Sequence, residues 1–107
     1  MRFSHICRAA LAAGFLVLGL ASAAADCRAD LAATDKSFEE TLKRLESVAK
    51  GTQAEKCAAY RSHVEVMTKG RDVFMRCMTG YSQRENVGQM NDSLEDFDTL
   101  IKARCAK

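Results

Sequence analysis

Four cysteines carry the clearest chemical potential in this sequence. The chain has five cysteines, and four lie beyond residue 25: Cys27, Cys57, Cys77 and Cys105. Thiols can form disulfides, bind zinc or act as a redox pair, and each role needs its own spacing. The sequence has no Cys-x-x-Cys motif, so it does not indicate a thioredoxin-like redox centre.

One histidine and one methionine have a spacing that suits a pair of metal ligands. His63 and Met67 lie four residues apart, so a helix would place both on one side. Imidazole and thioether ligands suit copper, and thioethers favour Cu(I). Methionine is also an ordinary core residue of helical proteins, and two ligands do not complete a site. We therefore assign no metal and no cofactor, and keep His63 and Met67 as weak copper candidates.

The sequence does not indicate a catalytic site. There is no Gly-x-Ser-x-Gly motif, and His63 is the single histidine beyond residue 25. Acids occur together at Glu39-Glu40 and in residues 92–98. Acidic side chains are mostly solvated, and a glycosidase pair needs a cleft that three helices rarely form. We predict a non-enzymatic protein with no catalytic residue.

The amino terminus has the pattern of a secretory signal peptide. Arg2 and Arg8 form a basic start, residues 9–21 are an apolar run, and an alanine-rich end follows. The apolar run is shorter than the roughly 20 residues that a membrane span needs. We therefore predict a cleaved signal peptide over residues 1–25 and a mature domain over residues 26–107. The predicted location is periplasmic or secreted, with no stable membrane anchor after cleavage.

Removal of this segment changes both the thiol count and the charge. Cys7 would leave with it, and the four remaining cysteines would suit two disulfides in an oxidising compartment. The formal net charge of +2 would fall to zero because Arg2 and Arg8 also leave. A neutral domain lacks the basic excess of nucleic-acid-binding proteins, so we expect no nucleic-acid partner.

Three segments have the periodicity of helices. Apolar residues recur at helical spacing over residues 27–49, 53–79 and 83–105, and the connections between these segments are short. This pattern predicts an all-α fold, a small antiparallel three-helix bundle. Gly70 and Gly88 lie inside the second and third segments, where a glycine costs a helix about 1 kcal/mol relative to alanine. A kink or break at either glycine, giving four or five helices, therefore stays open.

The predicted helix boundaries carry capping signals. Thr52 followed by Glu55 matches a capping box, and Ser82 followed by Glu85 matches a second one. Gly80 is predicted to end the second helix. Each of these signals places a helix boundary next to a short connection.

The bundle topology restricts the disulfide pairing. Cys57 and Cys77 lie 20 residues apart on the second helix, which separates them by about 30 Å. A disulfide needs its Cα atoms within about 7 Å, so the pairing that fits is Cys27–Cys77 with Cys57–Cys105. A zinc site built from all four thiolates does not fit, because the two pairs lie at opposite ends of the bundle.

The charges suggest one candidate interaction face. Basic residues gather in the second helix, and the face consists of Arg61, Lys69, Arg71 and Arg76. Acids gather at residues 92–98 of the third helix. Opposite charges of this kind either form exposed salt bridges between helices or present a polarised face to another protein.

These observations predict a small exported protein with a role in protein interaction, envelope structure or stress. The expected partner is another exported or envelope protein, and the oligomeric state is left open. The alternative is a carrier of a small ligand or copper that uses His63 and Met67.

Overall fold

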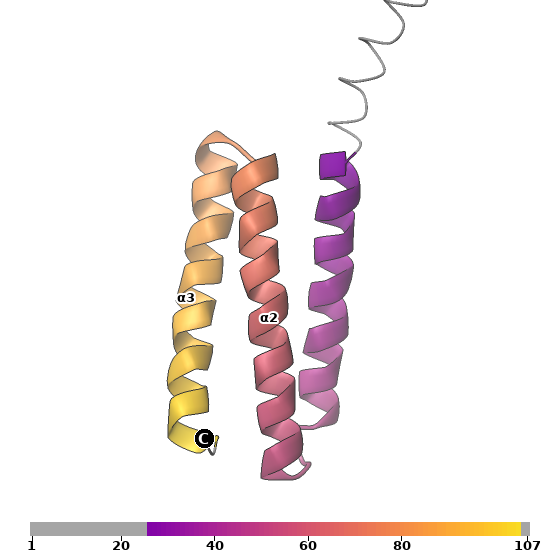
Figure 1. Ribbon diagram of the computed structural model, residues 1–107, viewed down its shortest axis with the longest axis vertical. Helices are drawn as coiled ribbons and strands as arrows, with labels where there is room; N and C mark the ends of the chain where they lie inside the picture. The colour runs from indigo at the N-terminus through magenta and orange to yellow at the C-terminus, as the bar shows by residue number, and fades with distance from the viewer. Residues whose placement is uncertain (1–25, 106–107) are drawn as a thin grey trace, which may run out of the picture.

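The computed structural model describes residues 26–105, which form three antiparallel helices (Figure 1). The first helix covers residues 26–47, α2 spans Gln53–Cys77 and α3 spans Gly80–Arg104. The described residues contain no strand. The all-α three-helix prediction is therefore confirmed. The predicted signal peptide over residues 1–25 lies outside the described part of the chain.

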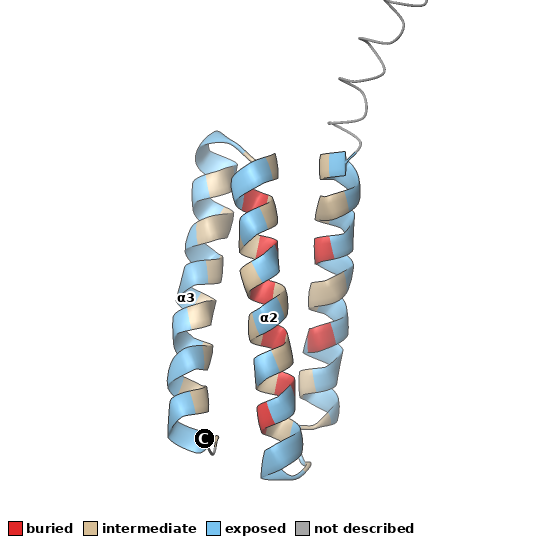
Figure 2. Ribbon diagram, in the orientation of Figure 1, coloured by how far each residue is buried: buried red, intermediate tan, exposed pale blue. Residues whose placement is uncertain are grey.

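Helix α2 lies between the other two helices and forms the core (Figure 2). Its buried residues are Cys57, Ala59, His63, Met67, Gly70 and Phe74. The first helix adds two buried threonines, Thr34 and Thr41, whereas α3 has no buried residue. The apolar stripe of α3 is thus only partly covered by α2. The central helix α2 contacts a neighbour on each side, and it therefore needs apolar residues on both sides.

Both internal glycines lie within continuous helices, which excludes a four- or five-helix arrangement of the described residues. Gly70 lies where the first helix packs tightly against α2. A Cβ atom added there would lie 2.5 Å from Phe38 Cζ and 3.1 Å from Thr34 Cγ2. Gly88 has no atom within 4 Å of such a position, so its helix has open space there.

The capping box at the start of α2 is confirmed. Thr52 Oγ1 accepts from the Glu55 amide at 3.1 Å, and Glu55 Oε1 accepts from the Thr52 amide at 3.1 Å. The amide of Thr52 lowers the pKa of the Glu55 carboxyl, because that hydrogen bond favours the charged form.

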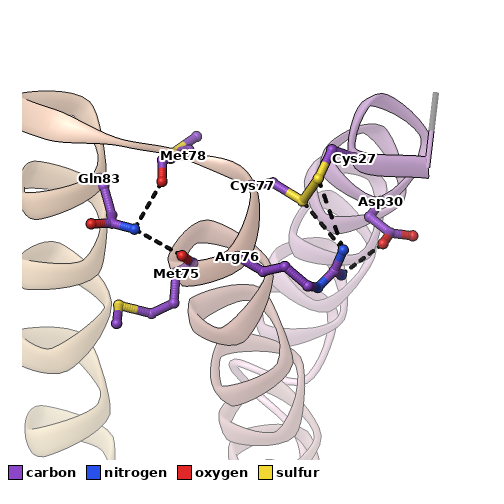
Figure 3. Close-up of a disulfide and its surroundings, with 7 residues drawn as sticks. All are labelled: Cys27, Asp30, Met75, Arg76, Cys77, Met78 and Gln83. Carbon is purple, nitrogen blue, oxygen red and sulfur yellow. Dashed lines mark hydrogen bonds and ion pairs between the residues drawn. A yellow bond between two sulfur atoms is a disulfide. The ribbon is translucent and has the colours of Figure 1, made fainter. Parts of the chain in front are cut away.

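The second predicted capping box, at Ser82, is wrong, and so is the prediction that Gly80 ends the second helix. Helix α2 ends at Cys77, and Gly80 is the first residue of α3. Gly80 has a φ of +61°, which glycine adopts without steric cost and which reverses the chain within two residues. Gln83 then stabilises the turn, since its Nε2 donates at 2.8 Å to the carbonyl oxygens of Met75 and Met78 (Figure 3).

The two predicted disulfides are both present, one at each end of the bundle. Cys27 is bonded to Cys77 with a Cα–Cα distance of 5.4 Å, and Cys57 to Cys105 with 5.7 Å. Each closes a long loop, with sequence separations of 50 and 48 residues. The first helix is thereby tied to one end of α2, and the end of α3 to the other.

Candidate functional site

An open groove runs between the two outer helices at the end that contains the Cys57–Cys105 disulfide. Its volume is about 410 Å³, and all three helices line it with Leu45, Val48, Ala49, Lys56, Tyr60, Phe97, Leu100 and Arg104. Six of these residues are apolar or aromatic and two are cationic, with no acid among them. The groove therefore combines an apolar floor with positive charge from Lys56 and Arg104.

Helical spacing brings the groove residues to one side. Val48 and Ala49 lie three and four residues after Leu45, in the turn that follows the first helix, and Lys56 and Tyr60 lie one turn apart on α2. Tyr60 packs against Phe97 of α3 with a ring centroid distance of 6.0 Å. The outer helices flank α2 and leave these side chains half-buried, apart from Ala49, which is exposed.

His63 lies beside the groove and links all three helices. Its side chain is 6% exposed, and its Nδ1 lies 2.6 Å from the Oγ1 of Thr41 on the first helix. Its ring also contacts Phe97 of α3, with a centroid distance of 5.0 Å. Burial lowers the pKa of His63, because the charged imidazolium loses hydration in this site.

The Thr41 hydroxyl constrains the imidazole in one of two ways. Oγ1 also lies 3.2 Å from the carbonyl oxygen of Ser37 and 3.3 Å from that of Phe38. A hydroxyl has one proton, so Thr41 either donates to Nδ1 or donates to a carbonyl and accepts from a protonated Nδ1. In both arrangements Nδ1 has a protein partner. The contact of this nitrogen with Thr41 therefore helps to specify how the first helix packs against α2.

The copper candidates occupy the core. Met67 is 2% exposed, and His63 uses Nδ1 to contact Thr41. Within residues 26–105, no three His, Cys, Asp or Glu side chains gather closely enough to hold a metal ion. Met75 lies twelve residues beyond His63 along α2, about 18 Å away, too far to share an ion with it. Copper binding through His63 and Met67 stays the alternative hypothesis, and the prediction remains that no metal is bound.

The four residues of the predicted basic face point to different neighbours. Arg71 Nη1 donates to Asn91 Oδ1 of α3 at 3.0 Å, whereas Arg76 forms an ion pair with Asp30 of the first helix at 2.7 Å. Lys69 lines a hollow of about 230 Å³ between the first helix and α2. Arg61 lines another hollow next to Cys57. The structure thus divides this face between the two sides of α2.

The Cys27–Cys77 disulfide has a cation beside it (Figure 3). Arg76 Nη1 lies 3.4 Å from Cys77 Sγ and 3.9 Å from Cys27 Sγ, while Nη2 bonds Asp30. Around the other disulfide, Cys57 is 5% exposed and its Sγ lies 3.9 Å from the carbonyl oxygen of Arg104. The two disulfides therefore differ in local charge and in the burial of Cys57, while Cys105 is half-buried like Cys27 and Cys77.

Sequence reasoning missed the groove and the cation at the disulfide. One signal for the buried polar contact was present: Thr34 and Thr41 lie two turns apart and interrupt the apolar side of the first helix. The contact between Arg76 and Cys27 joins residues 49 positions apart, and no local pattern indicates it.

Comparison with known proteins gives no relative for this chain, since no family model, curated protein or solved structure matches it. None of the described helices is both long and apolar enough to cross a bilayer. The molecule is a small helical protein with two disulfides, which is compatible with an exported role.

Proposed function

We propose that the mature domain is a non-enzymatic exported protein that binds an amphipathic helix of another exported protein in the groove. The observation that carries this proposal is the groove itself, which is apolar, open and lined by all three helices. Helix-in-groove recognition uses an apolar helix face that inserts side chains at spacings of three and four residues. An occupant would cover Phe97 and Leu100 of α3, which the bundle leaves only partly buried.

The charges of the groove define the chemistry of the partner. Lys56 and Arg104 contribute two cations and no lining residue contributes an anion. A helix with acidic residues beside its apolar face would complement this surface, which favours correct partners and faster association. The Cys57–Cys105 disulfide supports the site, because it ties the end of α3 to α2 beside the groove before binding and so reduces the ordering cost.

A photo-crosslinking experiment in cells tests this proposal. A photoreactive amino acid replaces Leu100 in the groove, and in a control protein it replaces the exposed Glu65 of α2. We expect a specific foreign protein to crosslink at position 100 and not at position 65. Absence of a crosslink at position 100, or a crosslink only to a second copy of this chain, would overturn the proposed partner.

Charge reversal in the groove then tests the proposal that the partner helix is acidic. The double variant Lys56→Glu with Arg104→Glu should lose the crosslink. The matched control reverses one lysine and one arginine outside the groove, Lys36→Glu with Arg84→Glu, and should keep it. Equal crosslinking by both double variants would contradict the assignment of an acidic partner.

The second candidate function is a carrier of a small ligand, and the groove volume favours it. A volume of about 410 Å³ falls within the range of about 300–1,000 Å³ that small-molecule sites occupy. Mass spectrometry of the purified mature protein under native conditions distinguishes the two functions. A stoichiometric small molecule that is lost in the Leu100→Glu variant would support the carrier and overturn the helix-binding proposal.

A further inference from the structure

The Cys27–Cys77 disulfide is partly exposed to solvent, and a positively charged side chain is held beside it. Both cysteines are partly exposed, and Arg76 places its guanidinium within 3.4 Å and 3.9 Å of the two sulfurs. Asp30 holds that guanidinium in place through a 2.7 Å ion pair (Figure 3). A cation at this distance favours a thiolate over a thiol on either sulfur.

Arg76 affects both sides of a thiol–disulfide exchange. The attacking species is an anionic thiolate, which a nearby cation attracts. The departing sulfur also becomes a thiolate, and Cys77 Sγ is the closer of the two sulfurs to the guanidinium. Cys77 is the last residue of α2, where the helix dipole opposes negative charge. Arg76 is therefore the group that can stabilise the departing thiolate.

The second disulfide supplies an internal comparison. Cys57 is 5% exposed, and its Sγ lies 3.9 Å from the Arg104 carbonyl oxygen, which carries partial negative charge. Gln53 Nε2 approaches the same sulfur at 3.7 Å, but an amide has no net charge. Burial thus disfavours attack at the Cys57 sulfur, whereas Cys105 is half-buried like Cys27 and Cys77, so the guanidinium of Arg76 is the main difference between the two bonds.

We propose that the Cys27–Cys77 disulfide is a modification site for low-molecular-weight thiols, and that Arg76 promotes the exchange. The thiolate sulfur of the incoming molecule forms a bond with Cys27 Sγ as the Cys27–Cys77 bond breaks. The electron pair of the broken bond stays on Cys77 Sγ, which departs as a thiolate beside the guanidinium. One disulfide and one thiolate enter and one of each leaves, so no oxidant is required.

The exchange leaves the proposed groove intact. The Cys57–Cys105 disulfide and the groove lie at the opposite end of the bundle. Opening the other bond releases the connection of the first helix to the end of α2. This inference does not depend on the proposed function, because it concerns a different end of the molecule.

Reduced glutathione provides the test. The oxidised mature protein is incubated with millimolar glutathione, sampled over time, quenched with acid and alkylated, and the cysteine peptides are identified by mass spectrometry. We expect a glutathione adduct on Cys27 with Cys77 alkylated, before any opening of Cys57–Cys105. Opening of both disulfides at the same rate, or an adduct on Cys77 in place of Cys27, would overturn the proposal.

Substitution of Arg76 separates the effect of charge from that of exposure. A less basic departing thiolate leaves faster, so a cation that stabilises it speeds the exchange. Arg76→Met should therefore slow adduct formation relative to the wild type, and Arg76→Lys should slow it less. Arg84→Met, an exposed arginine on α3, is the matched control and should react at the wild-type rate.

The Cys57–Cys105 bond serves as a folding control in every variant. Its opening rate should be the same in Arg76→Met and in the wild type, which shows that the bundle remains folded. An Arg76→Met protein that forms the adduct as fast as the wild type, or faster, would refute the role of the guanidinium.

Discussion

At the scale of single residues, the core of this protein contains a polar contact in place of continuous apolar packing. His63 and Thr41 meet between α2 and the first helix, and the ring of Phe97 covers the imidazole from α3. A buried polar group is tolerated when it has a partner, and its cost is then small. Such a contact also requires one alignment of the two helices, because a shift along either axis would separate the partners.

The buried imidazole should make stability depend on pH. The unfolded chain takes up a proton on His63 near pH 6.5, whereas burial lowers the pKa of the folded site. The unfolded state then binds more protons in this window, so the free energy of unfolding should fall as the pH drops through 6.5. Urea unfolding of the wild type and His63→Gln between about pH 8 and pH 5 measures this. Parallel profiles for the two proteins would contradict the prediction.

The two internal glycines should respond to the same substitution with opposite signs. Gly70→Ala places a methyl group against Phe38 and Thr34, and overpacking of this kind costs typically about 1–3 kcal/mol. Gly88→Ala meets no atom within 4 Å, so the higher helix propensity of alanine should raise stability by up to about 1 kcal/mol. Chemical denaturation of both variants measures the difference. Similar effects at the two positions would show that the close approach at Gly70 is not a constraint.

At the scale of elements, the two connections are built differently. The start of α2 is stabilised by side-chain caps on both Thr52 and Glu55. The start of α3 has no side-chain cap, and Thr79 precedes it in an extended conformation. Its entry depends on the positive φ of Gly80 and on the hydrogen bonds of Gln83 to the end of α2. A capping sequence therefore marks a helix start only when the chain has not already entered the helix.

Alanine substitution should distinguish the true cap from the apparent one. Thr52→Ala removes the acceptor of the Glu55 amide and should lower the free energy of unfolding by about 1 kcal/mol. Ser82→Ala is the matched control, since Ser82 is exposed inside α3, and should change stability by less than about 0.5 kcal/mol. Thermal unfolding followed by circular dichroism measures both. A larger loss at Ser82 than at Thr52 would be inconsistent with the observed helix starts.

At the scale of the whole molecule, one helix supplies most of the core and the disulfides secure the outer two. Figure 2 shows the buried residues concentrated on α2. A domain of this size has a modest core and often needs cross-links. The two disulfides each close a loop of about 50 residues, which the chain-entropy account values at about 4 kcal/mol.

Removing either disulfide should therefore cost a similar amount of stability but have different effects on binding. Cys27→Ser with Cys77→Ser and Cys57→Ser with Cys105→Ser should each lower the free energy of unfolding by about 4 kcal/mol. Crosslinking in the groove should persist in the first double variant and be lost in the second, which releases α3 next to the groove. Loss of crosslinking in the first variant alone would indicate that the interaction site lies at the other end.

The sequence by itself determined the all-α class, the order of the helical segments and, for a three-helix bundle, the disulfide pairing. Periodicity and the Thr52 cap are local signals, and the pairing followed because a rigid helix separates Cys57 from Cys77. Tertiary structure alone decided the groove, the Thr41–His63 contact and the position of Arg76 beside a disulfide. Each of these joins side chains from different helices, and their contacts depend on how the helices are rotated and spaced. Helical periodicity specifies which residues share a face, but packing of all three helices determines which face meets which.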